Sequence, residues 1–149
     1  MTDEEIIQRV ESAIDEAIKS DMKLLGTGGV EDTFASTVRD KLLPKFQTET
    51  VTVDVNYNKH HLATKTLNGN RIELDIAVHQ RHIDSENLVA IEVETSNYPK
   101  RDDVWKVENL TEDVDGYGYQ LGIFLVVGVK NKAGQILEKT WYKNGQILR

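Results

Sequence analysis

The sequence predicts an α/β (α+β) domain in which a mixed central sheet is flanked by helices. Its 149 residues suit one domain, since single domains commonly contain on the order of 100–150 residues. Apolar residues recur at helical spacing in some segments and alternate in others, in the order helix, helix, three strands, helix, two strands. This order favours a mixed sheet over a doubly wound parallel one. No repeat or proline-rich linker divides the chain, so we expect residues 1–149 to form a single domain.

The two N-terminal segments are predicted helices. Residues 1–19 place apolar side chains three and four positions apart on one stripe, with Thr2 or Asp3 as the N-cap. A glycine-rich break at residues 26–29 separates this helix from the next. The second helix is predicted over residues 31–43, and we expect Pro44 to end it.

The rest of the chain is predicted to form five strands and one more helix. Some strand segments alternate polar and apolar residues, whereas others are almost continuously apolar and are typical of buried strands. A turn at residues 131–134 is expected to join the last two strands. The predicted strands are residues 49–57, 71–79, 87–95, 119–129 and 135–142, and the predicted helix is residues 102–111.

The composition excludes several classes of protein. Hydrophobic residues make up 39% and charged residues 29%, which excludes wholesale disorder, and no apolar run approaches the roughly 20 residues of a membrane span. The absence of cysteine excludes a disulfide framework and a thiolate nucleophile. A net charge of −7 argues against coating of nucleic acid by bulk attraction, but not against an enzyme that recruits a cation. The acidic N-terminus lacks a basic, apolar leader, which predicts a cytoplasmic protein with no membrane partner.

Acidic residues inside two apolar strands are the most informative feature of the sequence. Asp75 lies between leucine and isoleucine, and Glu92 lies between isoleucine and valine. A buried carboxylate must be paired, protonated or bound to a metal, because its desolvation costs several kcal/mol. If the two strands are neighbours, Asp75 and Glu92 share a face with Glu94, and Mg²⁺ or Mn²⁺ would relieve their repulsion. The alternative is that these acids lie on the solvated face of a hairpin.

The same residues resemble a known family. An acid in one strand followed by an apolar strand ending in Glu-X-Lys is the signature of the PD-(D/E)XK nuclease superfamily. The chain is similar to its small stand-alone prokaryotic members of unknown role, over roughly residues 29–127. The matching motifs are Glu31, Val53-Asp54-Val-Asn-Tyr57-Asn58, Glu73-Leu-Asp75, Ile91-Glu92-Val-Glu94, Asp103-Val-Trp-Lys106-Val-Glu-Asn-Leu110-Thr111 and Tyr117-Gly-Tyr119.

The resemblance implies a restriction-endonuclease-like αβββαβ core, preceded here by an extra helix of about residues 2–20. It also implies that Asp75, Glu92 and the carbonyl of Val93 hold Mg²⁺ or Mn²⁺, with Glu31 as a ligand directly or through water. The metal would activate water to hydrolyse a phosphodiester bond of nucleic acid.

The chain departs from the family where it has Glu94 in place of the motif lysine, whose positive charge orients the attacking water and stabilises the transition state. Two compensations are open. Lys106 on the following helix could supply the charge, or Glu94 could help to bind a second cation. The alternative role of Lys106 is a structural ion pair with Asp102 or Asp103. The predicted catalytic residues are therefore Asp75, Glu92, Glu94 and Lys106.

Other residues carry weaker predictions. The adjacent histidines at 60 and 61 could ligate a metal, and His79 shares the face of Asp75 and could line its site. Three functions stay open at this point: a metal-dependent nuclease, weakened if the lysine is not replaced; a nuclease-fold domain that binds nucleic acid or a protein without cutting; and a small intracellular interaction protein.

Overall fold

The structure is a computed structural model of the chain, and it describes all residues except 29, 49, 58, 61–62, 65, 68–69, 72, 82–86 and 113–116. For residues 59–60, 63–64, 66–67 and 70–71 it describes the backbone only. Three α-helices and a six-stranded mixed sheet form the fold, so the prediction of an α+β domain with a mixed sheet is confirmed.

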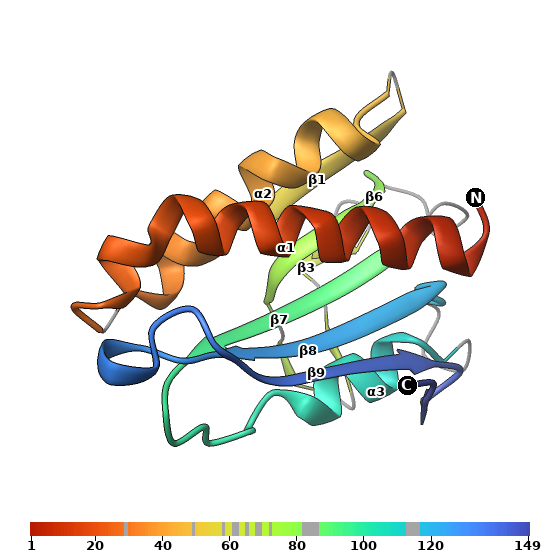
Figure 1. Cartoon of the computed structure of the whole chain (residues 1–149). Helices are drawn as coiled ribbons and strands as arrows, with labels where there is room; N and C mark the ends of the chain where they lie inside the picture. Colours follow the sequence, from red (N-terminus) through yellow and green to blue (C-terminus); the bar gives the residue numbers. More distant parts are fainter. Residues whose placement is uncertain are drawn as a thin grey trace.

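The sheet has the strand order β1-β6-β7-β8-β9-β10 (Figure 1). Strands β1, β6 and β7 form an antiparallel meander, β8 runs parallel to β7, and β9 and β10 return antiparallel. The strands are β1 (Val51–Tyr57), β6 (Leu74–Gln80), β7 (Val89–Thr95), β8 (Leu121–Val127), β9 (Ile136–Lys143) and β10 (Gln146–Ile147). Two short hairpins lie between β1 and β6: β2 (Lys59–His60) with β3 (Ala63–Thr64), and β4 (Thr66–Leu67) with β5 (Asn70–Arg71).

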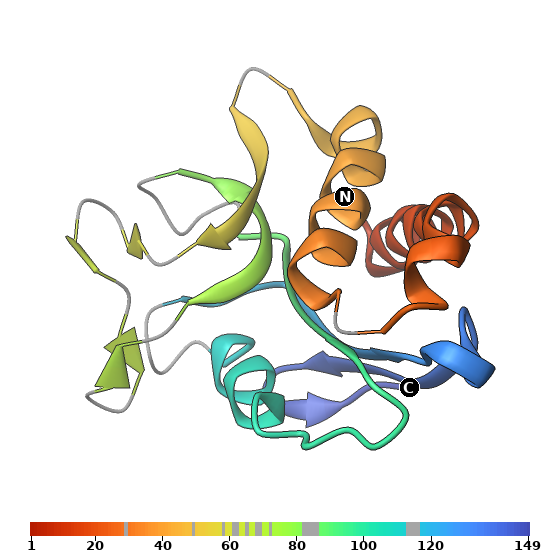
Figure 2. The ribbon, with the colours of Figure 1, turned by 90° about the vertical axis from the view of Figure 1, so that its left-hand side faces the viewer.

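Helices cover both faces of the sheet (Figures 1 and 2). On one face, α1 (Asp3–Leu25) and α2 (Glu31–Phe46) enclose the main apolar core with alternate residues of the strands. On the other face, α3 (Val104–Leu110) packs against β8, where Val107 contacts Phe124. Because a Cβ atom at Gly122 would lie 2.4 Å from Val107 Cγ1, glycine at this position lets α3 approach β8 closely. This close approach fixes the height of the α3 side chains above the sheet.

Both N-terminal helices are longer than the sequence predicts. Helix α1 continues six residues beyond the expected end, because Leu25 falls on the same buried stripe as Ile18 and ends in the core. Helix α2 continues through Pro44 to Phe46, so the expectation that Pro44 ends it was wrong. Proline in the last turn removes a single helical hydrogen bond, whereas Phe46 is buried in the core by the extra turn.

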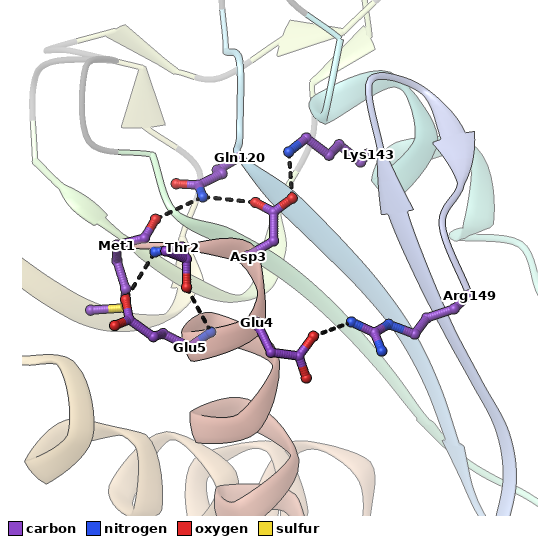
Figure 3. Close-up of polar contacts among 8 residues, drawn as sticks. All are labelled: Met1, Thr2, Asp3, Glu4, Glu5, Gln120, Lys143 and Arg149. Atoms are coloured by element: carbon purple, nitrogen blue, oxygen red, sulfur yellow. Dashed lines mark hydrogen bonds and ion pairs between the residues drawn. The ribbon is translucent and has the colours of Figure 1, made fainter.

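The N-terminus of α1 is attached to the end of the sheet where β8 begins (Figure 3). Thr2 and Glu5 form a capping box, with Thr2 as the N-cap. Asp3 accepts hydrogen bonds from Gln120 and Lys143, and Glu4 pairs with Arg149. These contacts join the first turn of α1 to the start of β8, the end of β9 and the last residue of the sequence.

The other element boundaries differ from prediction by only a few residues. A short 3-10 helix, η1 (Lys130–Lys132), occupies the predicted turn before β9. Within the described residues, no helix is both long enough and apolar enough to cross a membrane.

Candidate active site

The register of β6 and β7 brings Asp75 and Glu92 together. The ladder between these strands ends at Ile76 opposite Ile91, so Asp75 and Glu92 occupy the next facing positions. Both side chains lie on the sheet face that α3 covers. The Asp75 Oδ2 atom accepts a hydrogen bond of 2.8 Å from the backbone N–H of Val93, which fixes this carboxyl group against β7.

Glu92 is a buried acid whose carboxyl group lies against that of Asp75, within reach of a hydrogen bond when one of the two is protonated. Its side chain is 1% exposed, and within the described part of the chain no N–H or hydroxyl group donates a hydrogen bond to either of its carboxyl oxygens. Burial, and then the negative charge of Asp75, raise the pKa of Glu92 well above its usual range. Burial also raises the pKa of Asp75, against the opposing effects of its hydrogen bonds with the Glu92 side chain and the Val93 backbone. The pair therefore requires a proton or a cation to relieve its repulsion.

Lys106 extends from α3 toward this carboxyl pair. Its Nζ atom lies 3.9 Å from Glu92 Oε1, 2.9 Å from Asp103 Oδ1 and 3.3 Å from the carbonyl oxygen of Glu73. Burial lowers the pKa of Lys106, but the neighbouring carboxylates raise it by more, so its net pKa lies above the ordinary value and the amine stays charged. Lys106 therefore forms the ion pair with Asp103 that the sequence offered as the alternative, and its amine also lies beside Glu92; its catalytic role stays a prediction.

Glu31 joins the site from the opposite layer. As the first residue of α2, it reaches the end of β7, where its Oε1 atom accepts a hydrogen bond of 3.3 Å from the Thr95 N–H. Partial burial and the negative charges of Asp75 and Glu94 raise the pKa of Glu31 to about 6. Glu31 therefore lies near enough to Asp75 to feel its charge, and its predicted part as a metal ligand stays a prediction.

Glu94 has a structural role that the sequence did not indicate. Its two carboxylate oxygens accept hydrogen bonds of 3.1 Å and 3.0 Å from the backbone N–H groups of Lys100 and Arg101. These bonds hold the loop between β7 and α3, in which Arg101 adopts a positive φ of 61°. The structure thus shows an anchoring role for Glu94, while each oxygen keeps a second acceptor site and the predicted catalytic role stays a prediction.

Replacement of Glu94 by alanine is expected to release this loop. Loss of two charge-assisted hydrogen bonds should lower the free energy of unfolding by about 1–3 kcal/mol and speed tryptic cleavage after Lys100 and Arg101. Mass spectrometry of a digestion time course measures this, with Glu4→Ala as the control because Glu4 pairs with Arg149 away from the loop. Cleavage of the loop at the wild-type rate would show that Glu94 does not anchor it.

A polar cavity of about 280 Å³ lies beside these acids. Two of its lining residues also interact with the residues described above. The charge of Asp75 raises the pKa of Glu31, and Asp103 forms an ion pair with Lys106. The full lining is Glu31, Glu94, Ser96, Tyr98, Lys100, Asp102 and Asp103. Sequence reasoning missed Tyr98, because nothing in its local pattern distinguishes it from an ordinary loop residue.

His79 is held by β1 and not by the acids of β7. Its Nε2 atom lies 2.9 Å from Asp54 Oδ2, and its ring meets the Tyr57 ring edge-on at 4.1 Å. Arg81 Nε also donates to Asp54 Oδ2 at 3.0 Å. Burial raises the pKa of Asp54, but hydrogen bonds from His79 and Arg81 lower it by more, so the net pKa is well below the usual range. The predicted histidine pair at 60 and 61 lies outside the residues whose side chains are described.

The acids form a pair rather than a complete ligand set. In the part of the chain that the structure describes, no three His, Cys, Asp or Glu side chains are arranged to hold a metal. The facing carboxyl groups of Glu92 and Asp75, which receive few hydrogen bonds from donors, nevertheless suit a hard cation that takes further ligands from backbone, water or substrate. Comparisons of the chain with protein-family models, curated proteins and solved structures found no significant match.

Proposed function

We propose that the protein is a metal-dependent nuclease-like hydrolase that acts on phosphodiester bonds of nucleic acid. The observation that carries the proposal is the buried carboxyl group of Glu92, which faces the carboxyl group of Asp75 and lies 3.9 Å from the amine of Lys106. A fold gains nothing from such a group, since its burial costs free energy. Acids of this kind cluster where a site uses their charge.

The topology supports the proposal. Helix α2 is followed by the antiparallel strands β1, β6 and β7, then by the crossover helix α3 and the parallel strand β8. This is the order of elements in the αβββαβ core that the PD-(D/E)XK resemblance implies. The acids Asp75 and Glu92 lie on the second and third strands of that order, as the family motif requires.

The metal of the proposed site is Mg²⁺ or Mn²⁺. Its ligands would be Asp75, Glu92 and the carbonyl group of Val93. Glu31, at the start of α2, would bind the ion through water. When bound, the ion lowers the pKa of a coordinated water and stabilises negative charge on the phosphoryl oxygens. The carboxylates of Asp75 and Glu92 supply the negative charge that offsets the cost of moving the ion from water into this buried site.

Lys106 replaces the missing motif lysine in this proposal. Its charged amine is fixed by Asp103 and the Glu73 carbonyl group, beside the carboxyl that would bind the metal. A cation held there can stabilise the charge that develops on the phosphate in the transition state. The family lysine projects from the strand at the position of Glu94, whereas here the charge comes from the neighbouring helix.

Loss of the Asp75 carboxylate tests the proposal. We expect Asp75→Asn to weaken Mn²⁺ binding at least about tenfold, because a ligand charge is lost, and to abolish nicking of supercoiled DNA with Mg²⁺ or Mn²⁺. Titration calorimetry and a plasmid assay measure the two effects. Asp40→Asn is the matched control, since Asp40 is exposed on α2 and pairs with Arg39 at the surface. Equal Mn²⁺ binding by wild type and Asp75→Asn would overturn the metal site.

The same experiment distinguishes the nuclease from a second candidate function. A chain that binds Mn²⁺ through Asp75 but never cuts nucleic acid is a non-catalytic nuclease-fold domain that binds nucleic acid or a protein partner. The departure at Glu94 favours this candidate, because the residue anchors a loop instead of supplying charge.

A further inference from the structure

The loop between β7 and α3 presents an exposed aromatic ring. Tyr98 is 89% exposed, more than any other large hydrophobic side chain among the described residues. Such exposure gains no burial free energy for the fold. Single exposed aromatic residues are common, so exposure alone carries no inference.

The loop is held in place on both sides of Tyr98. Before it, the Asn97 side chain accepts a hydrogen bond from the Val129 N–H at 2.9 Å and donates one to the Val129 carbonyl at 3.0 Å. The Tyr98 N–H itself donates to Ser96 Oγ at 3.0 Å. After it, Glu94 binds the next two backbone N–H groups of the loop beyond Pro99. The backbone that carries the exposed ring is therefore preorganised, which reduces the entropic cost of binding a ligand.

Tyr98 lines a cavity that two neighbours of the proposed metal ligands also line. Tyr98 lines the cavity of about 280 Å³ together with Glu31 and Asp103. Both of these acids interact with the catalytic groups, Glu31 through the charge of Asp75 and Asp103 through Lys106. A phosphate bound at the metal would place a flanking nucleotide within this cavity.

We propose that Tyr98 stacks on an unpaired nucleobase next to the scissile phosphate, so that the substrates are single-stranded nucleic acid or the single-stranded part of a larger one. This inference rests on the proposed function and names its substrate class. A base within a duplex has both faces covered by its neighbours and cannot stack on a side chain, whereas an unpaired base can. The acidic cavity lining repels phosphate on its own, so the metal is needed to bring the strand in.

Binding of fluorescent oligothymidylate and of a blunt duplex of equal length, with Ca²⁺ in place of Mg²⁺ to slow cleavage, tests the inference. Anisotropy titrations should show Tyr98→Ala raising the Kd for the single strand by about 5- to 100-fold, the usual effect of removing one stacked base contact, while Tyr98→Phe retains the wild-type Kd. The Kd for the duplex should change less than about twofold in both variants. Ile147→Ala is the control, since Ile147 is 70% exposed and pairs near the opposite end of the sheet.

The possible outcomes separate this inference from the proposed function. Equal single-strand binding by wild type and Tyr98→Ala overturns the stacking role, even if Mg²⁺-dependent cutting persists. The stacking role is also overturned if the wild-type protein binds neither oligonucleotide. Tyr98-dependent binding of a basic peptide in place of the single strand overturns it as well. Tyr98-dependent single-strand binding in a chain that shows no Asp75-dependent Mn²⁺ site would leave the stacking contact itself standing, but it would overturn both the nuclease proposal and the role of the metal in bringing the strand in.

Discussion

Glu92→Gln is expected to stabilise the protein at neutral and alkaline pH and to abolish the proposed divalent-cation site. Glutamine matches the shape of the side chain but carries no charge, so the cost of burying an ionised carboxyl group beside Asp75 disappears. We expect the free energy of unfolding at pH 8 to rise by about 1–3 kcal/mol, within the range of single substitutions at buried charges. A residue that served only the fold would show the opposite sign.

The stabilisation should depend on pH in a defined direction. Burial raises the pKa of Glu92 in the folded protein, so the folded state holds its proton more tightly than the unfolded chain does. The contribution of protonated Glu92 to stability is therefore complete below the pKa of the unfolded chain, about 4.3. It is lost as the pH rises through the pKa of Glu92 in the folded protein. Wild type and Glu92→Gln should have nearly equal stability at acidic pH and diverge as the pH increases, with the variant the more stable.

Urea denaturation across this pH range, with and without Mg²⁺, measures both effects. Mg²⁺ at about 100 times its Kd should stabilise wild type by about 2.7 kcal/mol and leave Glu92→Gln unchanged. Glu4→Gln serves as the control, because Glu4 lies at the surface and pairs with Arg149. Lower stability of Glu92→Gln at pH 8 would mean that the carboxylate holds α3 through Lys106 and is not a metal ligand.

Local patterns in the sequence predict the elements of this fold well and their ends poorly. The apolar stripe of residues 6–18 belongs to α1 as expected, because such spacing buries one face of any helix. The helix continues to Leu25 because this leucine is buried, although a polar stretch separates it from the apolar stripe. The burial of Leu25 could not be predicted from local sequence, since it depends on the packing of α1 in the fold. The continuation of α2 past Pro44 likewise depends on a tertiary pocket for Phe46.

The site shows the same division between local and tertiary information. Strand alternation predicts that Asp75 and Glu92 share a face once their strands pair, and β6 and β7 are neighbours in the structure. The anchoring role of Glu94 could not be predicted, since its partners are backbone N–H groups that almost every residue carries. The position of Lys106 depends on how closely α3 approaches β8, which Gly122 permits from another part of the chain.

Lys106→Met is expected to reduce cleavage and strengthen cation binding at the same time. Removal of a preorganised positive group near the reacting phosphate typically lowers the rate constant by about 100- to 1000-fold. The Lys106 amine also repels a divalent ion at Glu92, from which it lies 3.9 Å away. Without it, the Kd for Mn²⁺ should fall, since less positive charge opposes the ion.

A slower cleavage rate together with tighter Mn²⁺ binding would distinguish a catalytic role of Lys106 from a purely structural one. If Lys106 only forms the ion pair with Asp103, its loss lowers stability but leaves the cleavage rate per folded molecule unchanged. Lys45→Met is the matched control, because Lys45 pairs with Glu16 at 3.2 Å and is similarly shielded from solvent on α2. Lys106→Arg should keep part of the activity, since the charge remains while its position shifts. A wild-type cleavage rate in Lys106→Met would remove this residue from the mechanism and leave the proposed site without its positive charge.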